Sequence, residues 1–207
     1  MQRKAFDVLV SIGGAVMVVV LLVAGVLLLW GASFANNNVH NQLAEQQITF
    51  PSAAAFAHAK PGTEITPSMI PSVSQYAGQQ LTTGAQAQVY ADDFIAVHLQ
   101  EIGGGKTYAQ LSAAAMALPK GSAAYTAAEA KVQTMFQGTT LRGLLLEAYA
   151  FSVLATIATV AAIAAFILAG LLALIVVFGF WHAHRTPETE ELEVHHTVPA
   201  KTALTTA

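Results

Sequence analysis

The chain has 207 residues, of which 55% are hydrophobic and only 10% are charged, and its mean hydropathy is +0.54. Soluble domains are about 25% charged, so this composition indicates an integral membrane protein. The net charge of −3 excludes a strongly basic surface, so we expect no nucleic-acid partner, and the lack of cysteine excludes disulfides and thiolate metal sites.

The first expected element is a transmembrane helix over residues 8–32, after a cytoplasmic segment of residues 1–7 that holds two basic side chains. A bilayer crossing needs roughly 20 apolar residues, so this run is long enough. Trp30 lies near its far end, and indole rings prefer the membrane interface. The alternative is a cleaved signal peptide, because residues 33–35 place small side chains where a signal peptidase reads them. The apolar core of a signal peptide is only about 7–15 residues long, so the sequence favours an uncleaved span.

Residues 33–139 are expected to form a small helical domain outside the cytoplasm. The first helix continues out of the bilayer and ends by Pro51, because the residue before a proline avoids the helical region. Residues 51–81 contain too many prolines and glycines for long elements, so we expect short turns there. No alternating strand pattern bounded by turn residues is found.

The strongest helical pattern of this domain covers residues 82–102. It predicts an amphipathic helix with Phe94 facing the core and Asp92 on the opposite, exposed face. The glycines at 103–105 are expected to end it. Thr107 then caps a helix over residues 108–118.

A further helix is expected over residues 122–137 and is predicted to stop at Gly138. The second membrane helix follows over residues 140–181, with a polar start outside the bilayer. Its stretch from Ala148 to Phe180 carries no charge, and the length of this stretch exceeds what a bilayer crossing requires. The fold class predicted is therefore an all-α membrane protein in which two transmembrane helices flank a small extracytoplasmic domain.

Basic residues set the expected orientation, because they favour the cytoplasmic side. Arg3 and Lys4 precede the first span, and Arg185 follows the second. Both termini are therefore predicted to be cytoplasmic, in the plasma membrane, although Lys131 and Arg142 weigh against this orientation. The glutamate-containing tail, residues 182–207, is expected to be disordered.

Small residues on the second span suggest a helix-packing face, because small side chains allow close helix approach in lipid. The alternative is that alanine is simply frequent in this span. The predicted face consists of Ala158, Ala162, Ala165, Ala169 and Ala173.

Several motifs resemble chemical sites, but each has a plainer structural explanation. The run GGGKT at residues 103–107 lacks the first glycine of a phosphate-binding loop, since position 100 is Gln100. His98 and Glu101 could be metal ligands only with partners from other helices. The histidine pairs at 182/184 and 195/196 could also bind a metal, but an interface anchor and a solvated tail are the plainer interpretations.

Two charged residues lie where the second span enters the bilayer, Arg142 and Glu147. They are five residues apart, slightly out of register for a helical ion pair. Glu147 could serve a proton relay, but a membrane-boundary or interhelical polar contact is the simpler interpretation. No serine lies in a nucleophile motif, so we expect no enzyme activity, no catalytic residue and no cofactor.

Three segments, at residues 89–99, 104–108 and 140–146, resemble a group of small actinobacterial membrane proteins, and the similarity extends from the first span to Trp181. Members of this group often carry the automatic label "aromatic ring-opening dioxygenase". Such chemistry needs several histidine and carboxylate ligands in one pocket, and this sequence offers no such set. The group has no established activity, so the resemblance implies no catalytic residue.

These observations favour a non-enzymatic accessory or scaffold subunit of a larger membrane assembly, for which a respiratory complex is one candidate. The expected partners are membrane lipid and either another membrane protein or further copies of this chain. The alternative is an extracytoplasmic module that binds or senses a ligand. A deep pocket in the outer domain would favour the alternative, and a flat apolar patch would favour the subunit.

Overall fold

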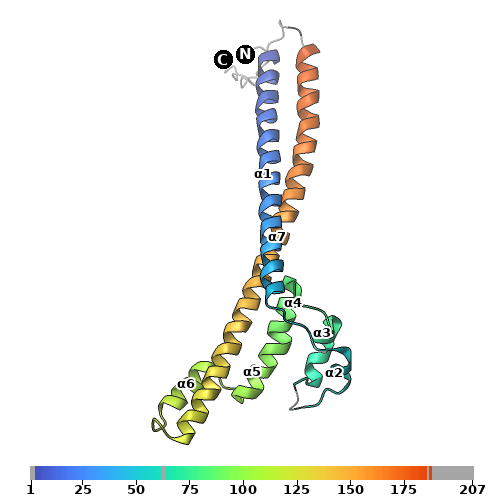
Figure 1. Ribbon diagram of the computed structural model, residues 1–207. Coiled ribbons are helices and arrows are strands. Elements are labelled where there is room, and N and C mark those ends of the chain that lie inside the picture. Colours follow the sequence, from blue (N-terminus) through green and yellow to red (C-terminus); the bar gives the residue numbers. More distant parts are fainter. Residues whose placement is uncertain (1–2, 62–63, 186, 188–207) are drawn as a thin grey trace, which may run out of the picture. The chain divides into compact units, whose positions relative to one another are not determined.

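The computed structural model describes residues 3–61, 64–185 and 187, and this part of the chain is entirely helical apart from turns and one isolated antiparallel bridge between Thr49 and Gln80 (Figure 1). The prediction of an all-α chain is thereby confirmed. Two helices, α1 (Arg3–Glu45) and α7 (Ala123–Arg185), are long and apolar enough to cross a membrane. The predicted tail glutamates and the histidine pair at 195/196 lie outside the described residues.

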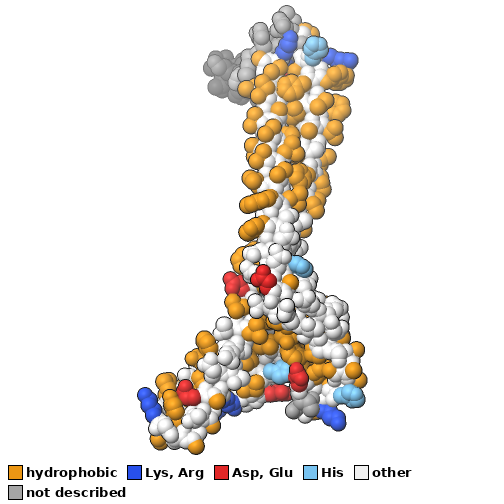
Figure 2. Space-filling model, viewed as in Figure 1, with side chains coloured by type: hydrophobic (Ala, Val, Ile, Leu, Met, Phe, Trp, Pro, Cys, Tyr) orange, Lys and Arg blue, Asp and Glu red, His pale blue; other side chains and the backbone are white. Residues whose placement is uncertain are grey.

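The chain divides into two compact units, one formed by residues 1–27 and 161–207 and the other by residues 28–160. In the first unit, the N-terminal part of α1 and the C-terminal part of α7 lie side by side (Figure 1). Their outer surfaces consist of large exposed apolar side chains, which Figure 2 shows along both helices.

The second unit contains the rest of α1 and α7 with several short helices between them. In chain order these are α2 (Ala53–Ala57), a 3₁₀ turn (Pro67–Met69), α3 (Ile70–Val73), a second 3₁₀ turn (Ser74–Tyr76), α4 (Gly84–Val89), a π-helical segment (Tyr90–Ile95), α5 (Ala96–Gly103) and α6 (Tyr108–Met116). The proline-rich segment thus forms only short pieces, as the sequence predicts.

Local sequence explains where several helices begin and end. Helix α1 ends at Glu45, where Gln47 has a positive φ of 53° and the Gln80 side chain donates to the Ala44 carbonyl at 3.0 Å. Helix α4 begins with a capping box, in which the Thr83 and Gln86 side chains satisfy each other's backbone amides. Helix α5 ends at Gly104, whose φ of 61° is left-handed.

The core of this unit gathers residues from segments far apart in the chain. Its largest fully buried side chains are Phe50, Met69, Val73 and Leu81. Val39 and Leu43 of α1 and Leu145 of α7 belong to the same cluster. The parts of both long helices that belong to this unit are therefore anchored to the short helices through one apolar core.

One predicted boundary is wrong. The helix expected over residues 122–137 does not stop at Gly138, because α7 runs without a break from Ala123 to Arg185. A Cβ at position 138 would lie 2.5 Å from Cδ2 of Leu99, so this glycine allows α5 to approach α7 closely. Packing against Leu99 thus outweighs the low helix propensity of this glycine.

The helix expected over residues 82–102 is found as a continuous helical segment from Gly84 to Gly103, whose middle part, Tyr90–Ile95, is π-helical rather than α-helical.

Candidate functional site: a groove between α1 and α7

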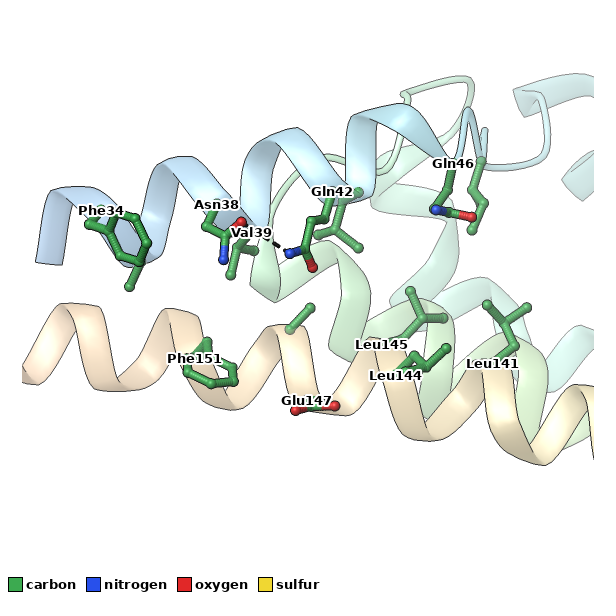
Figure 3. A pocket seen from close by; sticks show the side chains of 14 residues that line it. Phe34, Asn38, Val39, Gln42, Gln46, Leu141, Leu144, Leu145, Glu147 and Phe151 are labelled. Carbon is green, nitrogen blue, oxygen red and sulfur yellow. Dashed lines mark hydrogen bonds between the residues drawn. The ribbon is translucent and has the colours of Figure 1, made fainter. Parts of the chain in front are cut away.

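Within the unit of residues 28–160, a groove of about 500 Å³ lies between α1 and α7 (Figure 3). Its floor is made of core side chains, including the buried Val39, Leu43 and Leu145. The volume lies within the range of about 300–1,000 Å³ that is typical of small-molecule pockets. The floor is therefore apolar and fixed by the core of the unit.

The wall of the groove on α1 is a row of residues spaced by four. Phe34 lies at one end of this row, followed by Asn38 and Gln42 on the helix and by Gln46 in the turn that follows it, and the three amide side chains are exposed. Side chains spaced by four lie on one helix face, so Asn38 and Gln42 face the groove together, and Gln46 lines the groove just beyond the end of the helix. The Gln42 amide donates to the Asn38 side-chain oxygen at 3.0 Å, which leaves further donors and acceptors free for a ligand.

The wall on α7 is mostly apolar. Leu144 and Phe151 line it with 59% and 50% of their surface exposed. Figure 3 shows Phe34 and Phe151 at one end of the groove, and Gln46 and Leu141 at the other. The groove is thus apolar at its floor and on one wall, with hydrogen-bonding groups along the other wall.

Glu147 is the one charged residue among the described residues that line the groove. Its side chain is exposed, and it forms no ion pair with the part of the chain that the structure describes. Arg142 does not pair with it. Instead, its guanidinium Nη2 donates to Asp92 Oδ1 at 2.7 Å, joining α7 to the π-helical segment.

The expectation that Asp92 faces solvent without a role is therefore wrong, although the ion pair leaves 39% of each side chain exposed. The partner lies 50 residues away in the sequence, so helical periodicity could not identify it. The Nε atom of Arg142 is buried and has no hydrogen-bond partner among the described residues. The ion pair therefore joins two elements of the fold and does not line the groove.

The alanines predicted to form a packing face divide into two groups. Ala162, Ala165 and Ala169 are buried within the chain itself, whereas Ala158 and Ala173 are partly exposed. Four buried alanines of α7 are spaced by seven residues or by a multiple of seven, and the predicted face did not capture this spacing. These alanines are Ala155, Ala162, Ala169 and Ala183.

Close contacts in the unit of residues 1–27 and 161–207 show what covers this face. A Cβ at Gly14 would lie 2.6 Å from Cγ2 of Val176, and one at Gly25 would lie 2.8 Å from the Phe166 ring. Glycines on α1 therefore meet side chains of α7 directly. Because α1 covers the buried alanines, a partner protein would have to use a different surface.

The other motifs take the structural roles that the sequence analysis preferred. His98 Nδ1 is 2.8 Å from the Phe94 carbonyl oxygen, so the histidine bonds to backbone. The glycine run at 103–105 is the turn between α5 and α6, and Thr107 caps α6 in a capping box with Gln110. Across the described ranges, no three His, Asp or Glu side chains gather as a metal site would require.

His182 and His184 lie in the last turn of α7 rather than beyond the helix. His182 Nε2 is 4.0 Å from the Asp7 carboxylate on α1, and the Arg185 guanidinium lies 4.2 Å from the centre of the Trp181 ring. The polar end of this unit thus combines cationic and aromatic side chains, which is typical of a membrane interface.

No family model, curated protein or solved structure matches this chain. The amides of the groove were missed in the sequence analysis, although their regular spacing by four on an extension of the first span was a usable signal.

Proposed function

We propose that this chain is an integral membrane protein with two spans, both termini in the cytoplasm and its helical domain outside, and that it serves as a non-enzymatic accessory or scaffold subunit. The support for membrane placement is the distribution of exposed apolar side chains. Among the described residues, nearly all the large ones lie between Phe6 and Phe34 or between Leu144 and Trp181. Soluble proteins rarely expose apolar surfaces of this extent to water, whereas lipid tails would cover them.

The single observation that carries the subunit role is the exposure of large apolar side chains on the helical hairpin of α6 and α7, called the hairpin patch here. Met116 and Phe136 are 68% and 50% exposed, and the Phe136 ring packs against Tyr108 with ring centres 5.8 Å apart. Exposed apolar patches on soluble parts of proteins mark interaction surfaces. A partner protein that buries these three side chains would explain their exposure in the isolated chain.

Co-purification in mild detergent from the native host tests this proposal. A specific partner should be retained by the parent chain and lost from the variants Met116→Gln and Phe136→Gln. Ile70→Gln is the matched control, because Ile70 is another exposed apolar side chain outside the hairpin. Equal retention by all variants would contradict the role of the patch.

A reporter that is active only outside the cytoplasm tests the orientation separately. Fused at Lys120 it should be active, and fused after Arg185 it should be silent. The reverse pattern would refute the orientation. Activity at both positions would indicate that α7, which separates the two fusion points, does not cross the membrane.

A second candidate function is ligand binding outside the cytoplasm, which the groove between α1 and α7 favours. It has an apolar floor with a few convergent polar groups, as ligand sites commonly do. The two functions are compatible, because the groove and the hairpin patch use different residues.

A further inference from the structure

We propose that the groove between α1 and α7 binds one membrane lipid whose headgroup is uncharged and bears hydroxyl groups. This inference rests on the proposed membrane placement and assigns a ligand class to the groove. Its basis is the juxtaposition of Asn38, Gln42 and Gln46 on one wall with Leu144 and Phe151 on the other.

The polarity of the groove changes along its length in the direction a lipid would require. On α1, Trp30 and Phe34 stack with ring centres 6.0 Å apart, and Asn38 and Gln42 follow one turn at a time, with Gln46 just beyond the end of the helix. Phe151 lies across from Phe34, near the start of the long uncharged run of α7. Indole rings such as that of Trp30 prefer the boundary between lipid tails and water. The apolar end of the groove therefore suits acyl carbons, and the amide end suits a headgroup.

The charge of the lining selects among headgroups. Phosphate groups accept hydrogen bonds only, and proteins usually bind them with arginine or lysine. Neither residue is among the described residues that line the groove, where Glu147 would instead repel an anion. Hydroxyl groups both donate and accept, which matches side-chain amides that do the same. A sugar or polyol headgroup is therefore the complementary ligand.

The apolar walls favour a lipid over a water-soluble sugar. Leu144, Phe151 and Phe34 line the groove, and each has half or more of its surface exposed. A free sugar would leave these side chains uncovered, whereas an acyl chain would cover them and gain about 25 cal/mol for each Å² of apolar surface removed from water. A lipid therefore satisfies both walls at once.

The test uses the full chain in phosphatidylcholine nanodiscs that contain equal small fractions of a glucosyl diacylglycerol and of phosphatidylglycerol, with identical acyl chains. Each added lipid carries a photoreactive group near its headgroup. We expect the glucosyl lipid to crosslink preferentially, at residues 34–46 and 141–151. Native mass spectrometry of chains released from the nanodiscs should show the same lipid retained.

Gln42→Leu should reduce retention of the glucosyl lipid by about fivefold, the effect of one lost neutral hydrogen bond. Asn41→Leu is the matched control, because Asn41 is an exposed amide on the same helix but does not line the groove. Equal losses in the two variants would overturn the proposal. So would preference for phosphatidylglycerol, crosslinking of both lipids alike, or crosslinks that map elsewhere.

The outcomes also separate this inference from the placement on which it rests. A chain that enters nanodiscs with the expected orientation but shows no lipid preference would overturn the lipid site alone. A chain that does not enter nanodiscs would overturn the membrane placement and the lipid site together.

Discussion

At the level of single residues, a row of rings in tilted and edge-to-face contact lies in the unit of residues 28–160, which holds the proposed outer domain and is called the outer unit here. Phe50 contacts both Tyr76 and Tyr90, with ring centres 5.2 and 5.3 Å apart. Tyr90 packs on Phe94 at 4.7 Å, and Phe94 packs on His98 at 4.5 Å. Each such pair adds about 0.5–1.5 kcal/mol beyond the effect of burial. The row therefore links the proline-rich segment to the π-helical segment and to α5.

Phe94→Ala should lower the free energy of unfolding of the outer unit by roughly 3–5 kcal/mol, because Phe94 is buried in the core and contacts two rings. Gln100→Ala, at an exposed position of α5, should change it by less than about 0.5 kcal/mol. Chemical denaturation of both variants in detergent checks this. Similar effects of the two substitutions would mean that the assigned helix face is wrong.

The hydroxyl of Tyr90 should make the unit sensitive to alkali. Burial raises the pKa of Tyr90 above 10.0, and the nearby negative charge of Glu64 raises it further. The neutral hydroxyl is thus favoured in the folded state. Its stabilising effect is fully present below the unfolded pKa of about 10 and is lost as the pH rises through the higher folded pKa.

Tyr90→Phe removes the titrating group, so the difference in stability between the parent and this variant should be constant below about pH 9 and should shift in favour of the variant above about pH 10. Thermal unfolding followed by circular dichroism across this range measures the difference. A difference that stays constant to high pH would show that Tyr90 keeps its ordinary pKa in the folded unit.

At the scale of elements, close packing of short helices on α7 depends on particular glycines. A Cβ at Gly84, the first residue of α4, would collide with the Ser152 side chain and lie 3.3 Å from the Tyr149 Cα. Gly143, in contrast, lies in the interior of α7 with no neighbouring atom within 4 Å of such a Cβ. The two glycines therefore have opposite consequences when a methyl group is added.

Gly84→Ala should destabilise the outer unit by about 1–3 kcal/mol, because the added methyl group forces α4 and α7 apart. Gly143→Ala should stabilise it by up to about 1 kcal/mol, since alanine favours helix and nothing obstructs it. Denaturation curves of the two variants, compared with the parent chain, measure these changes in the free energy of unfolding. A stabilising Gly84→Ala would show that α4 does not approach α7 as closely as described.

At the scale of the whole molecule, the two long helices determine how the chain can associate. Hydrophobic burial does not drive helices together in lipid, so close approach and dispersion contacts must do so. In the unit of residues 1–27 and 161–207 these contacts lie between glycines of α1 and small or apolar side chains of α7. The alanine face is therefore expected to hold the two spans of one chain together.

Leucines at both Ala162 and Ala169 should separate the two spans, because each larger side chain replaces a close contact. Disulfide formation between Gly14→Cys and Val176→Cys reports the separation, since their side chains meet and the chain has no cysteine of its own. We expect crosslinking to fall in the double leucine variant. Ile163→Leu with Val160→Leu, at exposed positions, should leave it unchanged. If both variants crosslink alike, the face does not hold the spans together.

Local sequence patterns were enough to predict the helical class and the two apolar helices, because continuous apolar runs and helical periodicity are local properties of the chain. It also placed Phe94 in the core and the turn at residues 103–105 correctly. The membrane orientation, the subunit role and the family resemblance stay predictions.

Contacts between residues far apart in the sequence became visible only in the folded chain. There Arg142 pairs with Asp92 rather than with Glu147, and Gly138 allows close packing instead of ending a helix. The fold also brings the amides beginning at Asn38 opposite Phe151 to form the groove. The physical reason is the same in each case: these contacts depend on the register between helices, which packing of the common core sets and which no local pattern encodes.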